Sequence, residues 1–167
     1  MTTILEKDAC ELLDADHIAV KHLFVEYARL AFATGDKAAT DKLALARRIC
    51  SELTVHARIE EEIFYPALRG EIDEPQLLDE ATAEHQQAKE MIATIEQMQT
   101  PDASMDKLVA QLNVAIEHHV KEERDQLFPK ARASGLDLDA IGGQLQQRQD
   151  ELMAASTKPP ARSTARK

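Results

Sequence analysis

Four long stretches of this chain each carry an apolar stripe whose members recur at alternating spacings of three and four residues. Such spacing places the members of a stripe on one face of an α-helix. Segments containing glycine or proline, which favour helix ends, separate the stretches. The pattern predicts an all-α chain in which four helical faces are buried against one another. The stretches are residues 7–33, 38–68, 75–99 and 104–133.

Composition and connection lengths extend this prediction. Aromatic residues make up only 4% of the 167 residues, and helix-favouring Ala, Leu, Glu, Gln and Lys abound. Short connections make consecutive helices antiparallel neighbours, which predicts an up-down-up-down four-helix bundle. We expect the bundle to occupy residues 1–135. A short accessory helix at 136–155 should lie across one end of the bundle, followed by a disordered basic tail at 156–167.

Charge and apolar patterning limit the partners. The formal charge of −10 should repel nucleic acid phosphates. Charged residues interrupt the apolar ones throughout, and the N-terminus lacks the pattern of a signal peptide. We therefore expect no nucleic acid partner, no membrane association and a cytoplasmic location, while a protein partner stays unknown.

Each stripe is apolar except for one histidine, and the second and fourth stripes also carry a glutamate four residues after it. Counting from the connections puts the histidines at the same height to within about one helical turn, at 1.5 Å of rise per residue. A buried layer of this kind is unfavourable unless something neutralises it. Its members are His17, His56, Glu60, His85, His119 and Glu123.

A bound cation makes such a layer favourable, because it neutralises the carboxylates and uses the imidazole lone pairs. Imidazole and carboxylate ligands without thiolate suit iron, manganese or zinc. Six ligands exceed what one tetrahedral zinc ion requires. Two metal ions bridged by the two carboxylates account for the number.

The segments that hold these residues resemble those of the hemerythrin-like family, also called the HHE cation-binding domain. The resemblance covers about residues 8–133. It implies a non-haem di-iron centre with an oxo or hydroxo bridge, in which Glu60 and Glu123 bridge two Fe ions and the four histidines are terminal ligands. The matching segments are DADH ending at His17, HARIE with His56 and Glu60, EHQQAK with His85, and HVKEE with His119 and Glu123, together with FYP and LFP.

Two positions differ from the O2-carrying members of that family. Lys89 stands where they have a further histidine, and Glu123 follows His119 by four residues where they have an aspartate five residues after the histidine. His118 would restore the spacing of five, but the stripe and the repeat with His56 favour His119. Fewer neutral ligands leave exchangeable positions, so we expect reaction with O2 or peroxide rather than reversible O2 storage. The resemblance supports sensing or detoxification of O2, peroxide or nitric oxide, or iron handling, and leaves enzymatic turnover open.

Several other side chains flank the layer. Core packing is the favoured interpretation for the tyrosines, and a solvent-exposed position is favoured for the charged residues and for His118. The alternative is a direct role at the site, as a hydrogen-bond donor or as an additional ligand. Two cysteines should lie on opposite sides of the layer, about 20 Å apart, which excludes a disulfide between them. The cysteines are Cys10 and Cys50, and the flanking side chains are Tyr27, Glu61, Glu62, Tyr65, Lys89, His118 and Glu122.

Two further functions are alternatives. Ferritin-like di-metal oxidases place a glutamate three residues before a histidine, and here only Asp14 before His17 fits loosely, which disfavours that class. A metal-free helical interaction bundle would tolerate the loss of His56 or Glu60, or be stabilised by it. A melting temperature that depends on metal would separate this last alternative from a metal centre.

Overall fold

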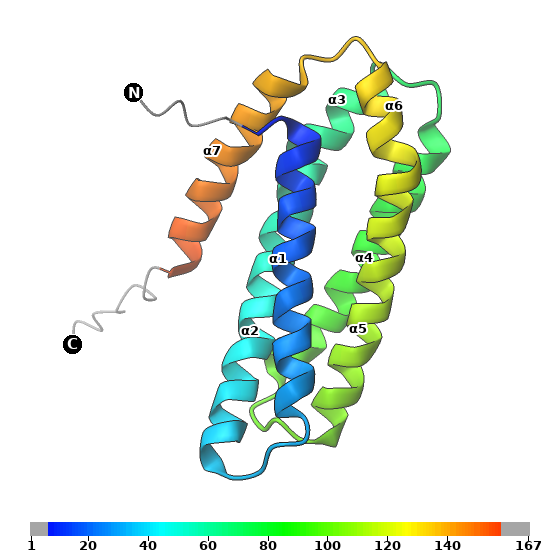
Figure 1. Cartoon of the computed structure of the whole chain (residues 1–167). Coiled ribbons are helices and arrows are strands. Elements are labelled where there is room, and N and C mark those ends of the chain that lie inside the picture. Colours follow the sequence, from blue (N-terminus) through cyan, green and yellow to red (C-terminus); the bar gives the residue numbers. More distant parts are fainter. Residues whose placement is uncertain (1–6, 158–167) are drawn as a thin grey trace, which may run out of the picture.

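The computed structural model describes residues 7–157, which are helical apart from short connections and contain no strand (Figure 1). The all-α prediction is confirmed for this part of the chain. The helices are α1 (Ala9–Leu30), α2 (Asp36–Ile59), η1 (Glu60–Phe64), α3 (Tyr65–Arg69), α4 (Pro75–Gln97), α5 (Ala103–Glu122), η2 (Glu123–Leu127), α6 (Phe128–Ala133) and α7 (Leu138–Thr157).

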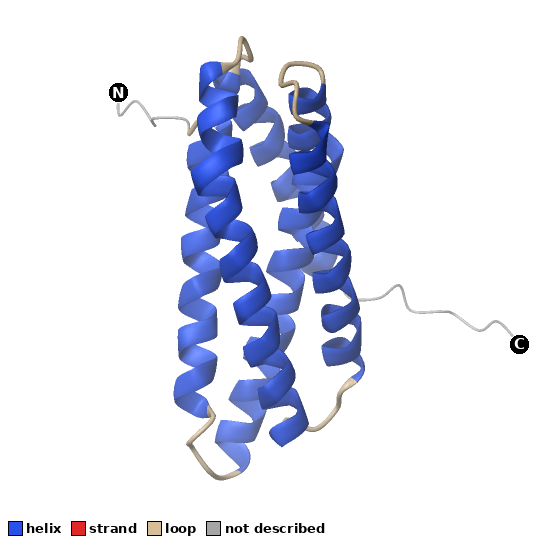
Figure 2. Ribbon diagram, turned by 90° about the vertical axis from the view of Figure 1, so that its right-hand side faces the viewer, coloured by secondary structure: helices blue, strands red, loops and turns tan. Residues whose placement is uncertain are grey.

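The long helices run side by side and are joined at alternate ends (Figures 1 and 2). α1 packs against α2, α4 packs against α5, and α2 packs against α4. α2 continues through η1 into α3, and α5 continues through η2 into α6. Each of the expected helices at 38–68 and 104–133 therefore consists of three successive segments. Within residues 7–157, none of the helices combines the length and the apolar character that crossing a bilayer needs.

Local sequence accounts for where the long helices begin. The carboxylate of Asp8 accepts a hydrogen bond from the backbone N–H of Glu11 at 2.8 Å, which caps α1. Asp102 caps α5 in the same way. Gly35 precedes α2 with φ of 105°, a conformation that residues with a side chain rarely adopt. Pro75 begins α4, where its missing N–H leaves no helical hydrogen bond unmade.

Two π-helical turns interrupt the long helices, and each begins at a glutamate of the predicted layer, Glu60 or Glu123. Pro66 and Pro129 follow these turns. A proline lacks the N–H for an α-helical hydrogen bond, and its ring clashes with the carbonyl four residues earlier. In both turns the N–H of the residue before the proline donates to the carbonyl of the glutamate, five residues earlier. The wider turn relieves the clash, so the repeated proline explains the repeated π-turn.

The buried apolar side chains form two clusters, one on each side of the predicted layer. The first includes Leu13, Phe64 and Phe128, and the second includes Phe24 and Leu112. Along α1, α4 and the α5–η2 segment, the stripe histidine separates residues of the first cluster from residues of the second. The polar layer therefore divides the core in two.

Both cysteines are free and buried, and they belong to different clusters. This arrangement agrees with the expectation that they do not pair. Burial raises the pKa of Cys10 to about 11 and that of Cys50 to about 12. Both thiols are therefore neutral at physiological pH, which makes them poor nucleophiles and poor metal ligands.

The C-terminal helix does not lie where the sequence suggested. α7 packs along the sides of α1, α2 and η1, so the expectation that it would lie across one end of the bundle is wrong (Figure 1). Ile141, Leu145 and Leu152 recur at helical spacing and are buried in the first apolar cluster. The apolar stripe runs along the length of α7, so it is buried best by lying alongside other helices. Of the expected tail at 156–167, residues 156 and 157 end α7, and the remainder lies outside the described residues.

Candidate metal centre

The six predicted site residues meet between the two apolar clusters, and none of their side chains lies at the surface. Each is at most 8% exposed, and the two glutamates are fully buried. Four different long helices supply one histidine each, and the two π-turns supply the glutamates. The structure thus brings together His17, His56, Glu60, His85, His119 and Glu123.

The imidazoles form two pairs in which like atoms face each other. The Nε2 atom of His17 lies 3.1 Å from the Nε2 atom of His56. The Nε2 atom of His85 lies 3.1 Å from the Nε2 atom of His119. Which atoms can carry protons in these pairs depends on what the other nitrogen of each ring contacts.

The outer nitrogen, Nδ1, of every one of these imidazoles faces a carboxylate. An ionised carboxylate only accepts hydrogen bonds, so Nδ1 of each ring carries a proton. In the neutral, metal-binding form of the ring, Nε2 then presents its lone pair to the centre of the layer. Metal-binding histidines are commonly oriented by such outer carboxylates. The Nδ1–oxygen distances are 3.3 Å for His17 and Asp14, 3.1 Å for His56 and Asp16, 3.5 Å for His85 and Glu61, and 3.0 Å for His119 and Glu84.

In that neutral form, the two Nε2 lone pairs of each pair face each other, repel and form no hydrogen bond. Two ligands about 2.1 Å from a common metal ion, at angles between tetrahedral and right-angled, lie about 3.0–3.4 Å apart. The Nε2–Nε2 separation of 3.1 Å in each pair falls in this range. The donor atoms therefore fit a cation between them.

Each buried glutamate lies between the two imidazole pairs. Oε1 of Glu60 is 2.9 Å from Nε2 of His56 and 3.4 Å from Nε2 of His85. Oε1 of Glu123 is 2.9 Å from Nε2 of His119 and 3.4 Å from Nε2 of His17. These separations are short, but their direction does not suit a hydrogen bond. All four carboxylate oxygens lack a hydrogen-bond partner within the described residues.

The electrostatics of the layer reflect this crowding of donors. Burial alone would lower the pKa of His56, but the charges of Glu60 and Asp16 raise it to about 10. Burial likewise opposes the effect of Glu123 on His119, whose pKa is well above its ordinary value. Burial would raise the pKa of Glu60, but the neighbouring imidazoles, led by His56, hold it well below the usual range. Without a cation, protons on His56 and His119 balance the charge of the buried carboxylates.

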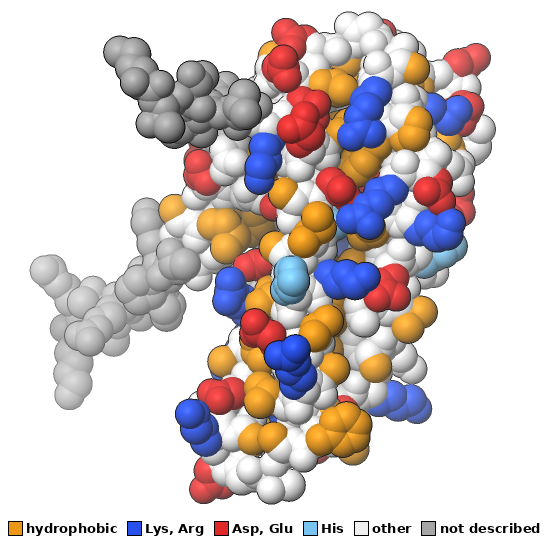
Figure 3. All heavy atoms as spheres, viewed as in Figure 1, with side chains coloured by type: hydrophobic (Ala, Val, Ile, Leu, Met, Phe, Trp, Pro, Cys, Tyr) orange, Lys and Arg blue, Asp and Glu red, His pale blue; other side chains and the backbone are white. Residues whose placement is uncertain are grey.

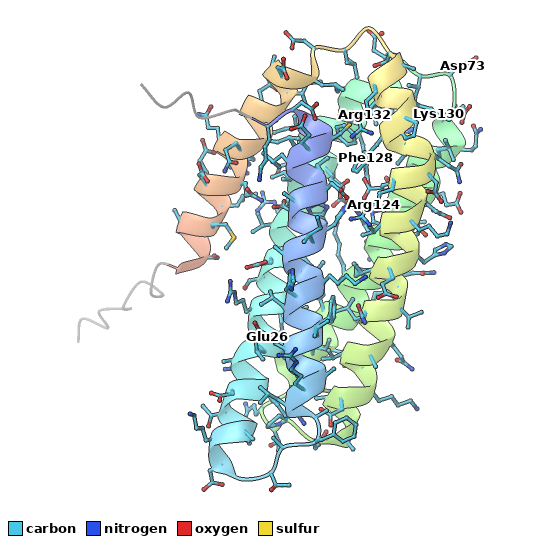
Figure 4. All side chains as sticks on the ribbon, in the orientation of Figure 1. Glu26, Asp73, Arg124, Phe128, Lys130 and Arg132 are labelled. Atoms are coloured by element: carbon cyan, nitrogen blue, oxygen red, sulfur yellow. The ribbon has the colours of Figure 1, made fainter. Side chains whose placement is uncertain are left out.

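A second layer of contacts holds the outer carboxylates in place. Glu61 was expected to be a solvated surface group, but its side chain is only 25% exposed and lies between His85 and Lys89. Lys89 thus binds Glu61 and does not point freely into solvent. Arg124 reaches from η2 toward α1 (Figure 4). The anchoring contacts are Arg124 to Asp14 at 2.5 Å, Gln149 to Asp16 at 2.7 Å, Lys89 to Glu61 at 2.7 Å and His118 to Glu84 at 3.3 Å.

Tyr65 reaches the layer as well. Its hydroxyl oxygen lies 3.3 Å from Nε2 of His85 and 3.4 Å from Nε2 of His119, and the residue is 3% exposed. Core packing was the favoured interpretation, and the ring does pack against Phe64. The position of the hydroxyl adds a polar contact at the centre of the site. Burial, together with Glu123 and Glu60, raises the pKa of Tyr65 well above its ordinary value, so the hydroxyl keeps its proton.

The remaining flanking residues lie away from the centre of the layer. His118 is 64% exposed and contacts Glu122 at 3.1 Å, as expected for a surface pair. Glu62 pairs with Arg58 at the surface. Tyr27 donates a hydrogen bond to Asp106 at 2.7 Å and belongs to the second apolar cluster.

Three of the outer carboxylates are marked by a local signal in the sequence. Asp14, Asp16 and Glu84 all lie within three residues before a stripe histidine, in the segments DADH and EH. Asp14, which fits an oxidase motif only loosely, contacts Nδ1 of His17 instead. No local pattern marks Gln149, which is 133 positions from the carboxylate it contacts.

Space for a small ligand lies beside the imidazoles. A cavity of about 30 Å3 is lined by the four stripe histidines and by apolar side chains, among them Leu53 and Ile92. This volume is enough for a molecule about the size of water. A surface groove of about 390 Å3 shares His17, Ile116 and Val120 with the cavity. The groove follows α1 and α5, on the face where acidic and basic side chains are interspersed in Figure 3.

Comparison with known proteins identifies a family and a similar fold. The family model described as hemerythrin HHE cation binding domain matches residues 8–131. Among solved structures, the chain is similar to a hemerythrin HHE cation binding domain-containing protein from Mycobacterium kansasii, with a TM-score of 0.72 and 22% sequence identity. The match covers 90% of each chain, and at this identity it concerns the fold. None of the curated proteins matches the chain in sequence.

Proposed function

The chain belongs to the hemerythrin HHE cation binding domain family. We propose that it is a non-haem di-iron protein that reacts with O2, peroxide or nitric oxide. His17, His56, His85 and His119 would be the terminal ligands. Glu60 and Glu123 would bridge the two iron ions. Sensing and detoxification are the roles that this reactivity favours, and iron handling is the third role open to such a site.

One observation carries the proposal. The layer holds two pairs of imidazoles with facing Nε2 atoms 3.1 Å apart, and between the pairs lie two carboxylates without hydrogen bonds among residues 7–157. Two groups of three donors, His17, His56 and Glu123 on one side and Glu60, His85 and His119 on the other, are each compact enough to hold an ion. Imidazole and carboxylate donors without thiolate suit iron.

The same observation argues against a metal-free interaction bundle. Such a bundle would have to bury two carboxylates and the protonated imidazoles that balance them, with no hydrogen bond to the carboxylate oxygens from the described part of the chain, which is unfavourable by several kcal/mol. The ferritin-like alternative lacks support because such sites combine four glutamates with two histidines. This layer instead holds four histidines and two glutamates.

The chain's own residues prepare the site for a small ligand. A bound iron pair would supply electrons and open coordination positions for O2, peroxide or nitric oxide. The outer carboxylates orient the imidazoles, and the apolar side chains around the cavity of about 30 Å3 exclude bulk water. The hydroxyl of Tyr65, which keeps its proton, lies where it can donate a hydrogen bond to a ligand at the centre.

Elemental analysis of the purified protein tests this proposal directly. We expect two iron ions per chain and visible absorption bands that change when peroxide or nitric oxide is added. One zinc ion per chain would contradict the di-iron proposal. A protein that retains no metal, also after anaerobic incubation with Fe2+, would leave only the helical bundle.

Replacement of Tyr65 with phenylalanine tests the role of its hydroxyl. The substitution removes one oxygen and keeps the ring contacts, so the fold and the iron content should be unchanged. Loss of a hydrogen bond of about 1 kcal/mol should slow the spectral reaction with peroxide by about 5-fold. Stopped-flow absorbance measures this rate. Tyr27→Phe is the matched control, because its hydroxyl contacts Asp106 instead, and equal rates for both variants and the wild type would contradict a role for Tyr65.

A further inference from the structure

α7 approaches the start of α1 so closely that only glycine fits at the contact. A Cβ atom added to Gly142 would lie 2.4 Å from the carbonyl oxygen of Lys7 and 2.9 Å from the carbonyl carbon of Asp8. A Cβ added to the next residue, Gly143, would meet nothing within 4 Å. Gly142 therefore allows α7 to lie directly against the backbone at the beginning of α1.

This close docking places one polar side chain of α7 against the candidate metal centre. Nε2 of Gln149 donates a hydrogen bond to Oδ2 of Asp16 at 2.7 Å. The same oxygen accepts the hydrogen bond from Nδ1 of His56 at 3.1 Å. A continuous chain of contacts thus leads from α7 to the imidazole whose Nε2 faces His17.

The side chain that holds Asp16 comes from a different part of the chain than the side chains that hold the other three outer carboxylates. Asp14, Glu61 and Glu84 are held by side chains of η2, α4 and α5, within the segment that the family model matches. Asp16 is held by a residue of α7, which begins after that segment ends at residue 131. A second contact, between Arg148 and Glu62 of η1 at 2.8 Å, ties α7 to the turn that carries Glu60.

We propose that α7 is a working part of the metal centre, in which Gln149 is a positioning residue that holds Asp16 against His56. The proposal rests on the proposed function, because it assigns α7 to the orientation of one ligand of the bound metal. It also predicts that only one of the two bound ions depends on α7. Loss of the α7 contact should weaken the ion held by His17, His56 and Glu123, and it should leave the ion held by Glu60, His85 and His119 in place.

Release of metal from the full chain tests the positioning role. The protein is loaded with Co2+, and its transfer to a chelator is followed through the visible absorption of the bound ion. In Gln149→Leu we expect one of two release phases to be about 10-fold faster, the lower end of the effect of losing an outer hydrogen-bond partner of a ligand. Gln149→Lys keeps a donor near Asp16 and should restore the wild-type rate. Gln144→Leu makes the same change at an exposed position of α7 and should have no effect.

The docking itself is tested with the glycine pair. Gly142→Ala forces α7 away from Lys7 and should accelerate the same release phase as Gln149→Leu. Gly143→Ala adds the same methyl group in open space and should leave both phases unchanged. Equal acceleration of both phases in Gln149→Leu or Gly142→Ala, or no acceleration in either, would overturn the proposal.

A measurement on the metal-free protein tests the positioning role of Gln149 separately from the proposed function. In the metal-free protein, the Nδ1–H proton of His56 should give a protected NMR signal in the wild type and in Gln149→Lys. It should exchange faster in Gln149→Leu. A wild type that binds no Co2+ would contradict the proposed function, and the NMR comparison would still decide whether Gln149 positions His56.

Discussion

Replacing Glu60 with glutamine is expected to reduce the metal content of the purified protein from two ions per chain to one or none. Glu60 lies between His56 and His85, at 2.9 and 3.4 Å, so its loss removes negative charge from both imidazole pairs at once. Glutamine has nearly the same shape but carries no charge. The fall in affinity should exceed the roughly 10–100-fold that loss of an outer-sphere partner produces.

Elemental analysis and competition with a chelator measure this effect. Glu123→Gln should behave in the same way, because Glu123 has the same relation to His119 and His17. Glu117→Gln is the control, since Glu117 is exposed on α5 only two residues before His119. Two tightly held ions in Glu60→Gln would rule out a bridging role for this carboxylate.

Removal of metal should produce the second large effect, a lower melting temperature. A cation that is present at about 1,000 times its dissociation constant stabilises the folded state by about 4 kcal/mol. In a domain of this size, 1 kcal/mol corresponds to about 2–4 °C. We therefore expect the metal-free protein to melt about 10 °C lower than the loaded one, as measured by calorimetry before and after chelation. Equal melting temperatures would contradict a structural contribution of the metal.

The same experiment at several pH values checks the electrostatics of the layer. The pKa of His56 in the folded metal-free protein is raised to about 10, so its stabilising contribution is complete below about 6.5. That contribution is lost as the pH rises toward 10. Glu60, whose pKa is lowered, loses its contribution as the pH falls below about 4.5. Stability of the metal-free protein should thus decline from pH 6.5 to 9.

The loaded protein should show a different trend over this interval. Metal binding requires imidazoles without a proton at Nε2, so affinity rises as protons become scarcer. The difference between the two melting temperatures should therefore widen from pH 6.5 to 9. A constant difference would show that the imidazoles do not exchange protons for metal.

Helical periodicity carried most of what could be predicted about the site. A stripe that holds one histidine must bury it, and the short connections bring the four stripes to one height. The comparison of His118 with His119 shows the strength of this signal. The two are adjacent in sequence, but the structure buries His119 in the layer and leaves His118 64% exposed.

The rest depended on contacts that periodicity does not encode. Glu61 lies one position off the stripe, and it faces His85 at the place where a π-turn changes the helical phase. Gln149 approaches Asp16 only because α7 lies along α1, which follows from tertiary packing against the first apolar cluster. The DADH and EH segments place carboxylates near histidines in the sequence. Only the fold shows which imidazole each carboxylate contacts. Asp16 precedes His17 in sequence but binds His56.

The placement of each glutamate between both imidazole pairs has a consequence for how the protein is made. The α1–α2 hairpin contributes His17, His56 and Glu60, and the α4–α5 hairpin contributes His85, His119 and Glu123. Neither hairpin alone offers more than two imidazoles and one carboxylate. A chain emerging from the ribosome therefore has no complete site until its second hairpin docks on the first. The proposed metal ions would then be bound only after the two hairpins have docked.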